Sequence, residues 1–342
     1  MGDDQPDYTM RERVGSRWDK ARLQVLLNAN RMALTGVVTV GMFVSFLLLG
    51  AATPFRQYML TMGPTRYMFQ ALVGALITGV TLVVTIAQLV LSQEIGPLGG
   101  QRERMSDAMS FRGDVEESFG SISPPEPEAF LQALIANSRE KAEAFRDAVD
   151  GTANGDLQED VDQFTDHLAD HADIVVEKLD GKTFGEYAVV EAALDYNYAE
   201  KIYQARRVRD RYGDDLSEDE RRALVDLLHV LSFFGPAREY IKNLYFQWEL
   251  VDLSRNIIYT TIPALVVTGS MAIYLSPSMF QGSTLGISDL VWVTSAGVTA
   301  GFVPFVLLST YILRLATIAK RTLAIGPFIL RDSERSSDIE WE

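Results

Sequence analysis

Four long apolar stretches set the strongest constraint on what this chain of 342 residues can fold into. They cover residues 32–52, 68–92, 257–275 and 290–313, and none of them contains a Lys, Arg, Asp or Glu. A helix needs about 20 apolar residues to cross the hydrocarbon core of a bilayer, and each stretch reaches or nearly reaches that length. We therefore predict an all-α polytopic membrane protein whose four transmembrane helices form two hairpins.

A strongly acidic segment separates the two predicted hairpins. From residue 94 to residue 255 the sequence holds 35 acidic and 18 basic residues, a net charge of −17, against −15 for the whole chain. The predicted order is a cytoplasmic N-terminal amphipathic helix at 1–31, transmembrane hairpin 1 at 32–92, an acidic cytoplasmic helical domain at 93–255, transmembrane hairpin 2 at 256–316 and a cytoplasmic C-terminal tail at 317–342.

Basic residues flank the apolar stretches unequally, and this asymmetry predicts the orientation. Arg102, Arg104 and Arg112 follow the second stretch, and six basic residues precede the first, whereas the loop 276–289 has none. Lys and Arg resist translocation across a membrane. We therefore place both termini and the acidic segment in the cytoplasm, and the protein in the cell (plasma) membrane with the lipid bilayer as a partner.

Composition narrows the classes of function. An acidic surface repels the phosphates of nucleic acids, so we expect no nucleic-acid partner. The chain has no cysteine, which excludes disulfides and thiolate metal sites. It carries no phosphate-binding loop and no hydrolase or kinase signature, so we expect neither an enzyme nor a bound cofactor. The excess of Asp and Glu over Lys resembles that of proteins from salt-loving archaea.

The acidic segment is predicted to form a series of amphipathic helices after a cluster of helix-breaking residues at 121–127. The first two carry apolar stripes ending near Gly151 and at Gly181, and a third is expected over about 184–212. A fourth begins at Ser217, whose spacing to Glu220 matches a capping box, and ends before Gly235 and Pro236. A last helix from Ala237 is expected to continue through Arg255 into the third apolar stretch.

One face of the second apolar stretch is polar. Thr78, Thr81, Thr85 and Gln88 recur at spacings of three, four and three, which places them on one side of a helix. These residues are candidates for lining a pore, because hydroxyl groups can line a water path. The alternative is that the hydroxyls bond their own helix backbone or hold neighbouring helices together.

Proline and glycine residues interrupt the second pair of apolar stretches. Pro263 and Pro304 remove backbone hydrogen bonds in mid-helix, and Gly297 and Gly301 are four residues apart. These four residues are candidate hinges for gating. They could equally be static kinks and places where helices pack closely.

The acidic segment contains one pattern with metal-ligand spacing. His167 and His171 are four residues apart in a predicted helix, hence on one face, and Asp170 is a neighbouring carboxylate that could complete the shell of a divalent ion. The alternative is that the stretch is simply the polar side of a helix in an acid-rich domain.

Two classes of function remain open from the sequence. The first is an oligomeric channel-like protein that passes small ions, with cations favoured by the acidic domain; four helices are few to enclose a pore, so a homo-oligomer is expected. The second is a non-conducting membrane scaffold or signalling adaptor whose acidic helices dock a cytoplasmic protein partner, for example in envelope organisation or cell shape. The layout is similar in outline to bestrophin-type channels, which also place cytosolic helices between two membrane hairpins, but the chain has no matching motif.

Overall fold

A computed structural model describes residues 25, 27, 29–52 and 63–321. In these ranges the chain is mostly helical, which confirms the all-α prediction. Most of the predicted N-terminal amphipathic helix and nearly all of the predicted C-terminal tail lie outside the described residues. The chain divides into two compact units, one with described residues 96–246 and 319–321, the other with described residues from 25–95 and from 247–318. We call them the acidic unit and the apolar unit.

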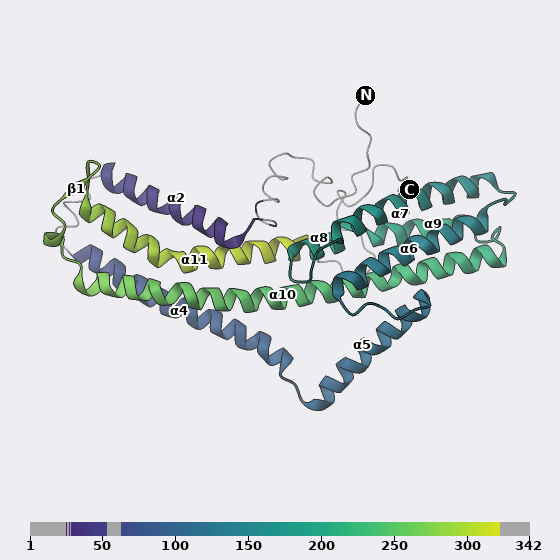
Figure 1. The fold of residues 1–342 in the computed structure, drawn as a ribbon, viewed down its shortest axis with the longest axis horizontal. Coiled ribbons are helices and arrows are strands. Elements are labelled where there is room, and N and C mark those ends of the chain that lie inside the picture. The colour runs from purple at the N-terminus through teal and green to yellow at the C-terminus, as the bar shows by residue number, and fades with distance from the viewer. Residues whose placement is uncertain (1–24, 26, 28, 53–62, 322–342) are drawn as a thin grey trace, which may run out of the picture. The chain divides into compact units, whose positions relative to one another are not determined.

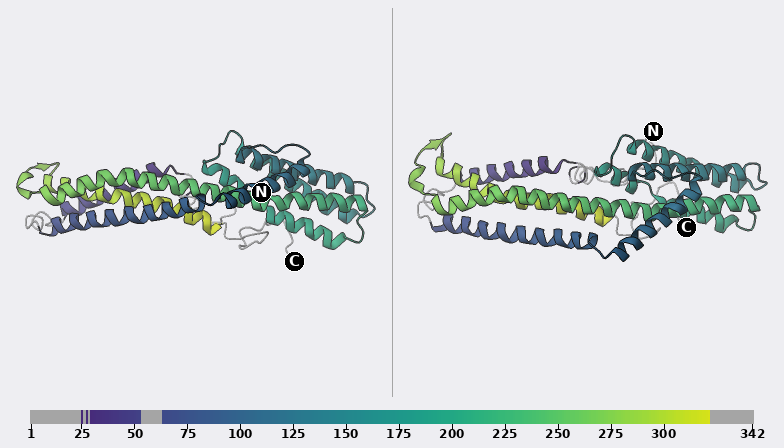
Figure 2. Two further views of the ribbon diagram at one scale, coloured as in Figure 1. Left: turned by 90° about the horizontal axis from the view of Figure 1, so that it is seen from below. Right: turned by 60° about the horizontal axis from the view of Figure 1, so that its bottom comes forward.

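The apolar unit contains a helix at each of the four predicted stretches. These are α2 (Arg31–Ala52), α4 (Gly63–Glu94), the second half of α10 (Glu218–Tyr274) and α11 (Asp289–Arg321). All four are long and apolar enough to cross a membrane. Asn30 caps α2, because its side-chain oxygen accepts hydrogen bonds from the backbone N–H groups of Met32 and Ala33 at 2.9 and 3.3 Å. The second half of α10 lies beside α11 in the views of Figures 1 and 2.

A short hairpin precedes α11, which the sequence did not predict. After the 3-10 helix η1 (Pro277–Met279), β1 (Ser283–Thr284) pairs antiparallel with β2 (Ile287–Ser288). Leu285 and Gly286 form the turn with φ angles of 52° and 77°. Two-residue turns of this hand favour Asn or Gly, so the exposed Leu285 is an unusual residue at its position.

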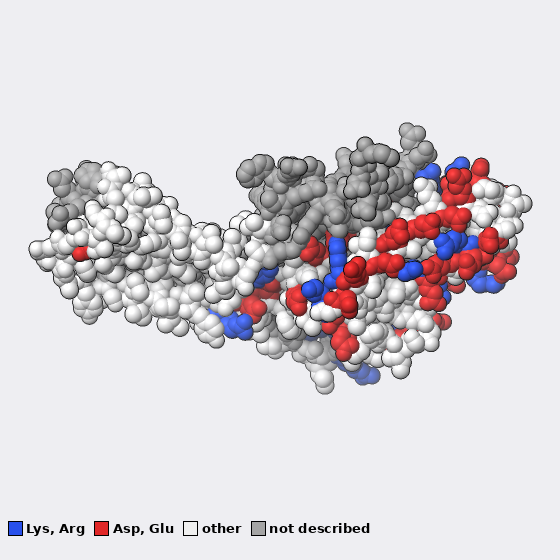
Figure 3. Space-filling model, turned by 45° about the horizontal axis from the view of Figure 1, so that its top comes forward, with Lys and Arg blue, Asp and Glu red and all other residues white. Residues whose placement is uncertain are grey.

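The acidic unit is built from α5 (Leu98–Phe119), α6 (Pro127–Val149), α7 (Gly155–Leu179), α8 (Tyr187–Asp195), α9 (Tyr198–Tyr212) and the first half of α10. A large apolar cluster joins residues of α6, α7, α9 and α10. The stripes predicted for the first two helices are buried throughout. Figure 3 shows acidic side chains gathered over this unit, while the visible face of the apolar unit is almost without charge.

Two predicted helix boundaries in the acidic unit are wrong. The helix expected over about 184–212 is interrupted between α8 and α9, where Tyr196 turns into the core and its hydroxyl lies 2.6 Å from the Ser138 hydroxyl. The helix expected to end before Gly235 instead continues to Tyr274. Proline costs one helical hydrogen bond, but the neighbouring Phe234 and Ala237 are buried, so packing outweighs the loss.

Helix α5 was not predicted from the sequence, because apolar residues do not mark one face of that helix. The expectation that the last helix continues through Arg255 into the third apolar stretch is confirmed, since α10 is unbroken there.

The predicted capping box is present at the start of α10. The Ser217 backbone N–H donates to Glu220 Oε2 at 2.6 Å, and the Glu220 N–H donates to Ser217 Oγ at 3.3 Å. We expect Ser217→Ala to lower the free energy of unfolding by about 1 kcal/mol, because an N–H group of the first turn loses its acceptor. Denaturant unfolding followed by circular dichroism measures the effect. The exposed Ser232→Ala serves as the control, and equal stability of the two variants would contradict the capping role.

Candidate functional site

The polar residues predicted on α4 lie on the outside of the apolar unit. Thr78, Thr81, Thr85 and Gln88 are all exposed, and at 100° per residue they occupy an arc of about 80°. We call this set the α4 polar stripe. The threonine hydroxyls donate to backbone carbonyls one turn earlier, those of Gly74, Ile77 and Thr81, at 3.0, 2.9 and 2.9 Å.

This geometry combines features of both sequence interpretations of the stripe. Each hydroxyl is bonded to its own helix, as in the structural alternative, yet its oxygen keeps acceptor capacity on the outer face of the bundle. Because α4 presents these groups outward, one copy of the chain does not enclose them. The stripe can bind only something outside the described unit: lipid, water, an ion or another protein chain.

The candidate hinge glycines lie at close contacts between helices of the apolar unit. A Cβ added at Gly297 would lie 3.1 Å from the ring of Phe69 on α4 and 3.2 Å from Met271 on α10. One added at Gly301 would lie 2.9 Å from Thr268 Cγ2 and 3.2 Å from Leu72. The two glycines therefore let α11 approach both neighbours, as small residues spaced by four do in membrane helices.

Substitution of Gly301 tests this packing. Because Thr268 is completely buried and cannot move aside, we expect Gly301→Ala to lower stability by about 1–3 kcal/mol. Gly269→Ala is the matched control, since nothing lies within 4 Å of its added Cβ, and it should be neutral or stabilising by up to about 1 kcal/mol. Thermal unfolding in detergent distinguishes the two variants. A Gly301→Ala protein as stable as the control would show that the contact is not close.

The candidate hinge prolines lie inside helices. Pro304 interrupts the hydrogen bonding of α11, and Pro263 lies within α10. A cavity beside Pro304, lined also by Thr261 and Gly79, has a volume of about 10 Å³. A space of this size holds at most about one water molecule, so it is no conduction path.

A buried ion pair joins three helices of the apolar unit. Arg31 at the start of α2 pairs with Glu249 of α10, and both side chains are about 90% buried. The Arg31 guanidinium also lies 4.3 Å from the ring centre of Tyr311 on α11, whose hydroxyl accepts a hydrogen bond from Asn256 at 2.8 Å. Sequence reasoning missed this pair, because its members are 218 residues apart and neither is in a recognisable motif.

Removing one member of this pair should be costly. We expect Glu249→Ala to lower stability by about 3–5 kcal/mol, because the Arg31 charge would stay buried without its carboxylate. The control is Asp252→Ala on the same helix, whose exposed pair with Arg255 contributes about 0–1 kcal/mol. Unfolding in detergent provides the measurement. Similar losses in both variants would contradict the assigned difference between the buried and the exposed pair.

Of the three predicted metal ligands of α7, the two histidines lie on one face and Asp170 does not join them. His171 is buried and its Nδ1 lies 2.8 Å from the Nζ of the fully buried Lys201, whereas Asp170 points to solvent. His167 stays on the face of His171, with ring centres 6.4 Å apart. The residues that the structure describes contain no group of three or more side chains that could hold a metal ion. The metal site therefore stays a prediction from the sequence.

Carboxylates near these histidines bind arginines of α6 instead. Asp166 pairs with Arg146 at 2.9 Å, and Asp173 pairs with Arg139. The contacts of Arg139 with Glu143 and Asp173 raise the pKa of its guanidinium. These pairs hold the polar sides of α6 and α7 together on the surface of the acidic unit.

His171 belongs to a buried polar cluster whose other members are Ser138, Tyr196 and Lys201. The Lys201 ammonium lies 4.7 Å from the ring centre of Tyr196, and burial raises the pKa of the Tyr196 hydroxyl. Similarly, burial and the hydrogen bond to Asp160 raise the pKa of Tyr212 to about 12. The cluster links α6, α7 and α9 and fixes their register, because a buried polar group without a partner is costly.

These features define a mostly helical protein with four helices long and apolar enough to cross a membrane. The chain matches over residues 1–342 the model of a family described as "Family of unknown function (DUF7972)", and it belongs to that family. No curated protein and no solved structure matches the chain.

Proposed function

We propose that this protein is an oligomeric channel of the plasma membrane that passes small cations. In this proposal α2, α4, the second half of α10 and α11 cross the bilayer as two hairpins, with both termini and the acidic unit in the cytoplasm. The observation that carries the proposal is the α4 polar stripe, which lies on the outside of the apolar unit. Lipid tails offer no hydrogen-bond partner to the outward lone pairs of these hydroxyls or to the amide, whereas a water-filled path shared by several copies does.

The chemistry of the stripe favours cations. Each threonine oxygen has used its proton in a bond to the helix, so only its lone pairs face outward. Such oxygens act as acceptors for a cation that has lost part of its hydration shell. Acidic side chains of the acidic unit would raise the cation concentration at the cytoplasmic entrance, because charged clefts attract counter-ions.

Conduction requires several copies. The cavity beside Pro304 is too small for a water path, and the α4 polar stripe faces outward, so the proposal places the ion path between subunits. A ring of subunits that places α4 at its centre would bring the stripes together around one axis.

Flux measurements test the proposal. The purified protein should be a closed oligomer in detergent and should pass K⁺ when reconstituted in liposomes. The double variant Thr81→Val and Thr85→Val should keep the oligomeric state but lose most of the flux, because its stripe lacks two acceptor oxygens. Ser45→Ala is the control, since this exposed hydroxyl on α2 also bonds its own helix, at Gly41. A monomer without flux, or undiminished flux in the double variant, would contradict the proposal.

A non-conducting scaffold or adaptor is the second candidate, and one observation favours it. The exposed carboxylates of α7, with those of neighbouring helices, form the acidic surface in Figure 3, which suits a basic protein partner. A protein without flux whose binding of a defined cytoplasmic partner is lost on Asp→Asn substitution along α7 would favour this role over conduction.

A further inference from the structure

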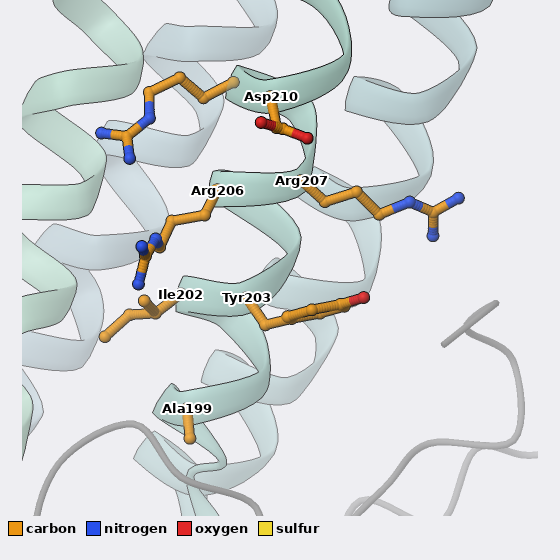
Figure 4. A pocket seen from close by; sticks show the side chains of 7 residues that line it. Ala199, Ile202, Tyr203, Arg206, Arg207 and Asp210 are labelled. Atoms are coloured by element: carbon orange, nitrogen blue, oxygen red, sulfur yellow. The ribbon is translucent and has the colours of Figure 1, made fainter. Parts of the chain in front are cut away.

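Two exposed surfaces of the described chain differ in what they offer a partner. An open groove of about 410 Å³ runs along α9 of the acidic unit, and the described residues that line it all belong to that helix. In Figure 4 the side chains of Arg206 and Arg207 extend to opposite sides of α9. One helix does not enclose a ligand. The hairpin before α11, residues 282–289, is different, because several of its features point to one partner.

The hairpin exposes apolar surface at the end of the apolar unit. Leu285 at its turn is 87% exposed, and Met279 in η1 and Tyr274 at the end of α10 are exposed as well. The loop 275–288 contains no Lys, Arg, Asp or Glu. Exposed apolar side chains on an uncharged loop suit contact with lipid or with another protein better than contact with water.

Leu285 adopts a backbone conformation that disfavours its side chain. Its φ of 52° lies in the left-handed region, where the Cβ atom of an L-residue approaches the following carbonyl oxygen. Glycine and asparagine are the usual residues in such a turn. Strain of this kind persists where the surroundings offset it. A leucine at this position therefore calls for a contact that favours its side chain, and its exposure shows that the described chain provides little of one.

Hydrogen bonds hold the hairpin in a fixed conformation. The Asp289 N–H donates to the Gly282 carbonyl at 3.0 Å, and the Asp289 carboxylate accepts from the Thr284 hydroxyl at 2.7 Å. Trp292 Nε1 donates to the Thr284 carbonyl at 3.2 Å. A Cβ atom added at Gly282 would clash with the Asp289 carboxylate. That carboxylate is thus bonded within the hairpin, and Leu285 is presented at a set position.

The two faces of the hairpin differ in polarity. Thr284 is paired with Ile287 and Ser283 with Ser288, and directly paired side chains share a face. One face therefore carries the serines, and the other carries Ile287 with Thr284, whose hydroxyl is bonded to Asp289. Figure 2 shows that the hairpin extends sideways at the end of α10 and α11, as an element that lies along a membrane surface would.

We propose that the turn of this hairpin inserts into the outer leaflet of the membrane, with Leu285 among the phospholipid headgroups and the upper acyl chains. Insertion depends on the proposed crossing of the bilayer by α10 and α11, and not on ion conduction. It makes the outer hairpin a membrane anchor rather than a loop free in water.

The connection to the two helices favours lipid over a protein partner. Leu285 is four residues before Asp289, where α11 begins, and is therefore at most about 14 Å from it. The bilayer that α11 would cross lies within this reach of the turn, whereas a protein partner would have to be recruited to it. Tyr274 and Trp292 lie at the adjoining helix ends, and such aromatic residues are enriched where lipid meets water.

Spin labelling of the full-length protein in phosphatidylcholine liposomes tests the proposal, because the chain has no native cysteine. A nitroxide is attached to Leu285→Cys, to Ser283→Cys on the serine face, or to Val266→Cys on the exposed side of α10. Its collision rates with oxygen and with a water-soluble nickel chelate report depth. The oxygen-to-nickel ratio at Leu285→Cys should exceed that at Ser283→Cys at least about threefold, because apolar oxygen concentrates in hydrocarbon and the chelate stays in water.

The three positions separate failure of insertion from failure of the membrane topology. A ratio at Val266→Cys as low as that at Ser283→Cys would contradict the bilayer crossing of α10, and insertion with it. A high ratio at Val266→Cys with equal, low ratios at Leu285→Cys and Ser283→Cys would overturn insertion alone. Low collision rates with both reagents at Leu285→Cys would assign the turn to a protein contact, a second copy included, and would also overturn insertion.

A second variant separates the role of the leucine side chain from the affinity of the label for lipid. Asparagine tolerates the left-handed conformation, so Leu285→Asn should keep the hairpin. With the nitroxide at Ile287→Cys, Leu285→Asn should lower the oxygen-to-nickel ratio at least about twofold, because the turn loses its apolar anchor. Leu285→Met is the matched control and should preserve the ratio. Equal ratios in Leu285→Asn and Leu285→Met would overturn the proposal.

Discussion

The main constraint on this structure is that its four long apolar helices expose much of their surface, because the rest of the described chain buries little of it. Only 11% of the most apolar window of α2 is buried, and 22% of the corresponding windows of α4 and α10, against 56% for α11. Water would make this exposed surface unfavourable at about 25 cal/mol per Å². In the membrane that we propose for this protein, lipid would cover this surface and helix association would depend on close packing and polar contacts, which fits the glycines of α11.

Within the apolar unit, α11 is the element on which the others pack. Its glycines lie in close contact with Phe69 and Leu72 of α4 and with Met271 and Thr268 of α10. Its Tyr311 ring lies against Arg31 of α2, which pairs with Glu249 of α10. A buried ion pair thus holds the helices together where α2 begins, and glycines allow close helix packing along the apolar length of α11. The outward face of α4 is left with hydroxyls that the unit itself does not need for packing, and this makes α4 the helix that our proposal places at the shared axis.

The sequence predicted what depends on local patterns. Uninterrupted apolar stretches identified the four long helices, and periodic apolar residues identified α6 and α7. The spacing of Ser217 and Glu220 identified the capping box of α10. Elements decided by distant contacts were not predictable: α10 continues through Gly235 and Pro236 because Phe234 and Ala237 are buried, and α8 ends where Tyr196 turns toward Ser138. The same limit applies to the candidate site. Residue spacing placed the α4 polar stripe on one face of its helix but could not tell that this face points outward. Spacing also grouped His171 with Asp170. In the structure His171 contacts Lys201, whereas Asp170 is exposed to solvent.

Labelling of single cysteines tests the central claim, that the uncovered helices cross a bilayer and leave the acidic unit on the inner side. Ser283→Cys lies in the hairpin before α11 and Asp170→Cys on the exposed side of α7, and the chain offers no other thiol. In intact cells a membrane-impermeant maleimide should label Ser283→Cys, whereas Asp170→Cys should react only after lysis. Labelling of Asp170→Cys in intact cells, or recovery of the protein in the aqueous fraction after lysis, would contradict the account.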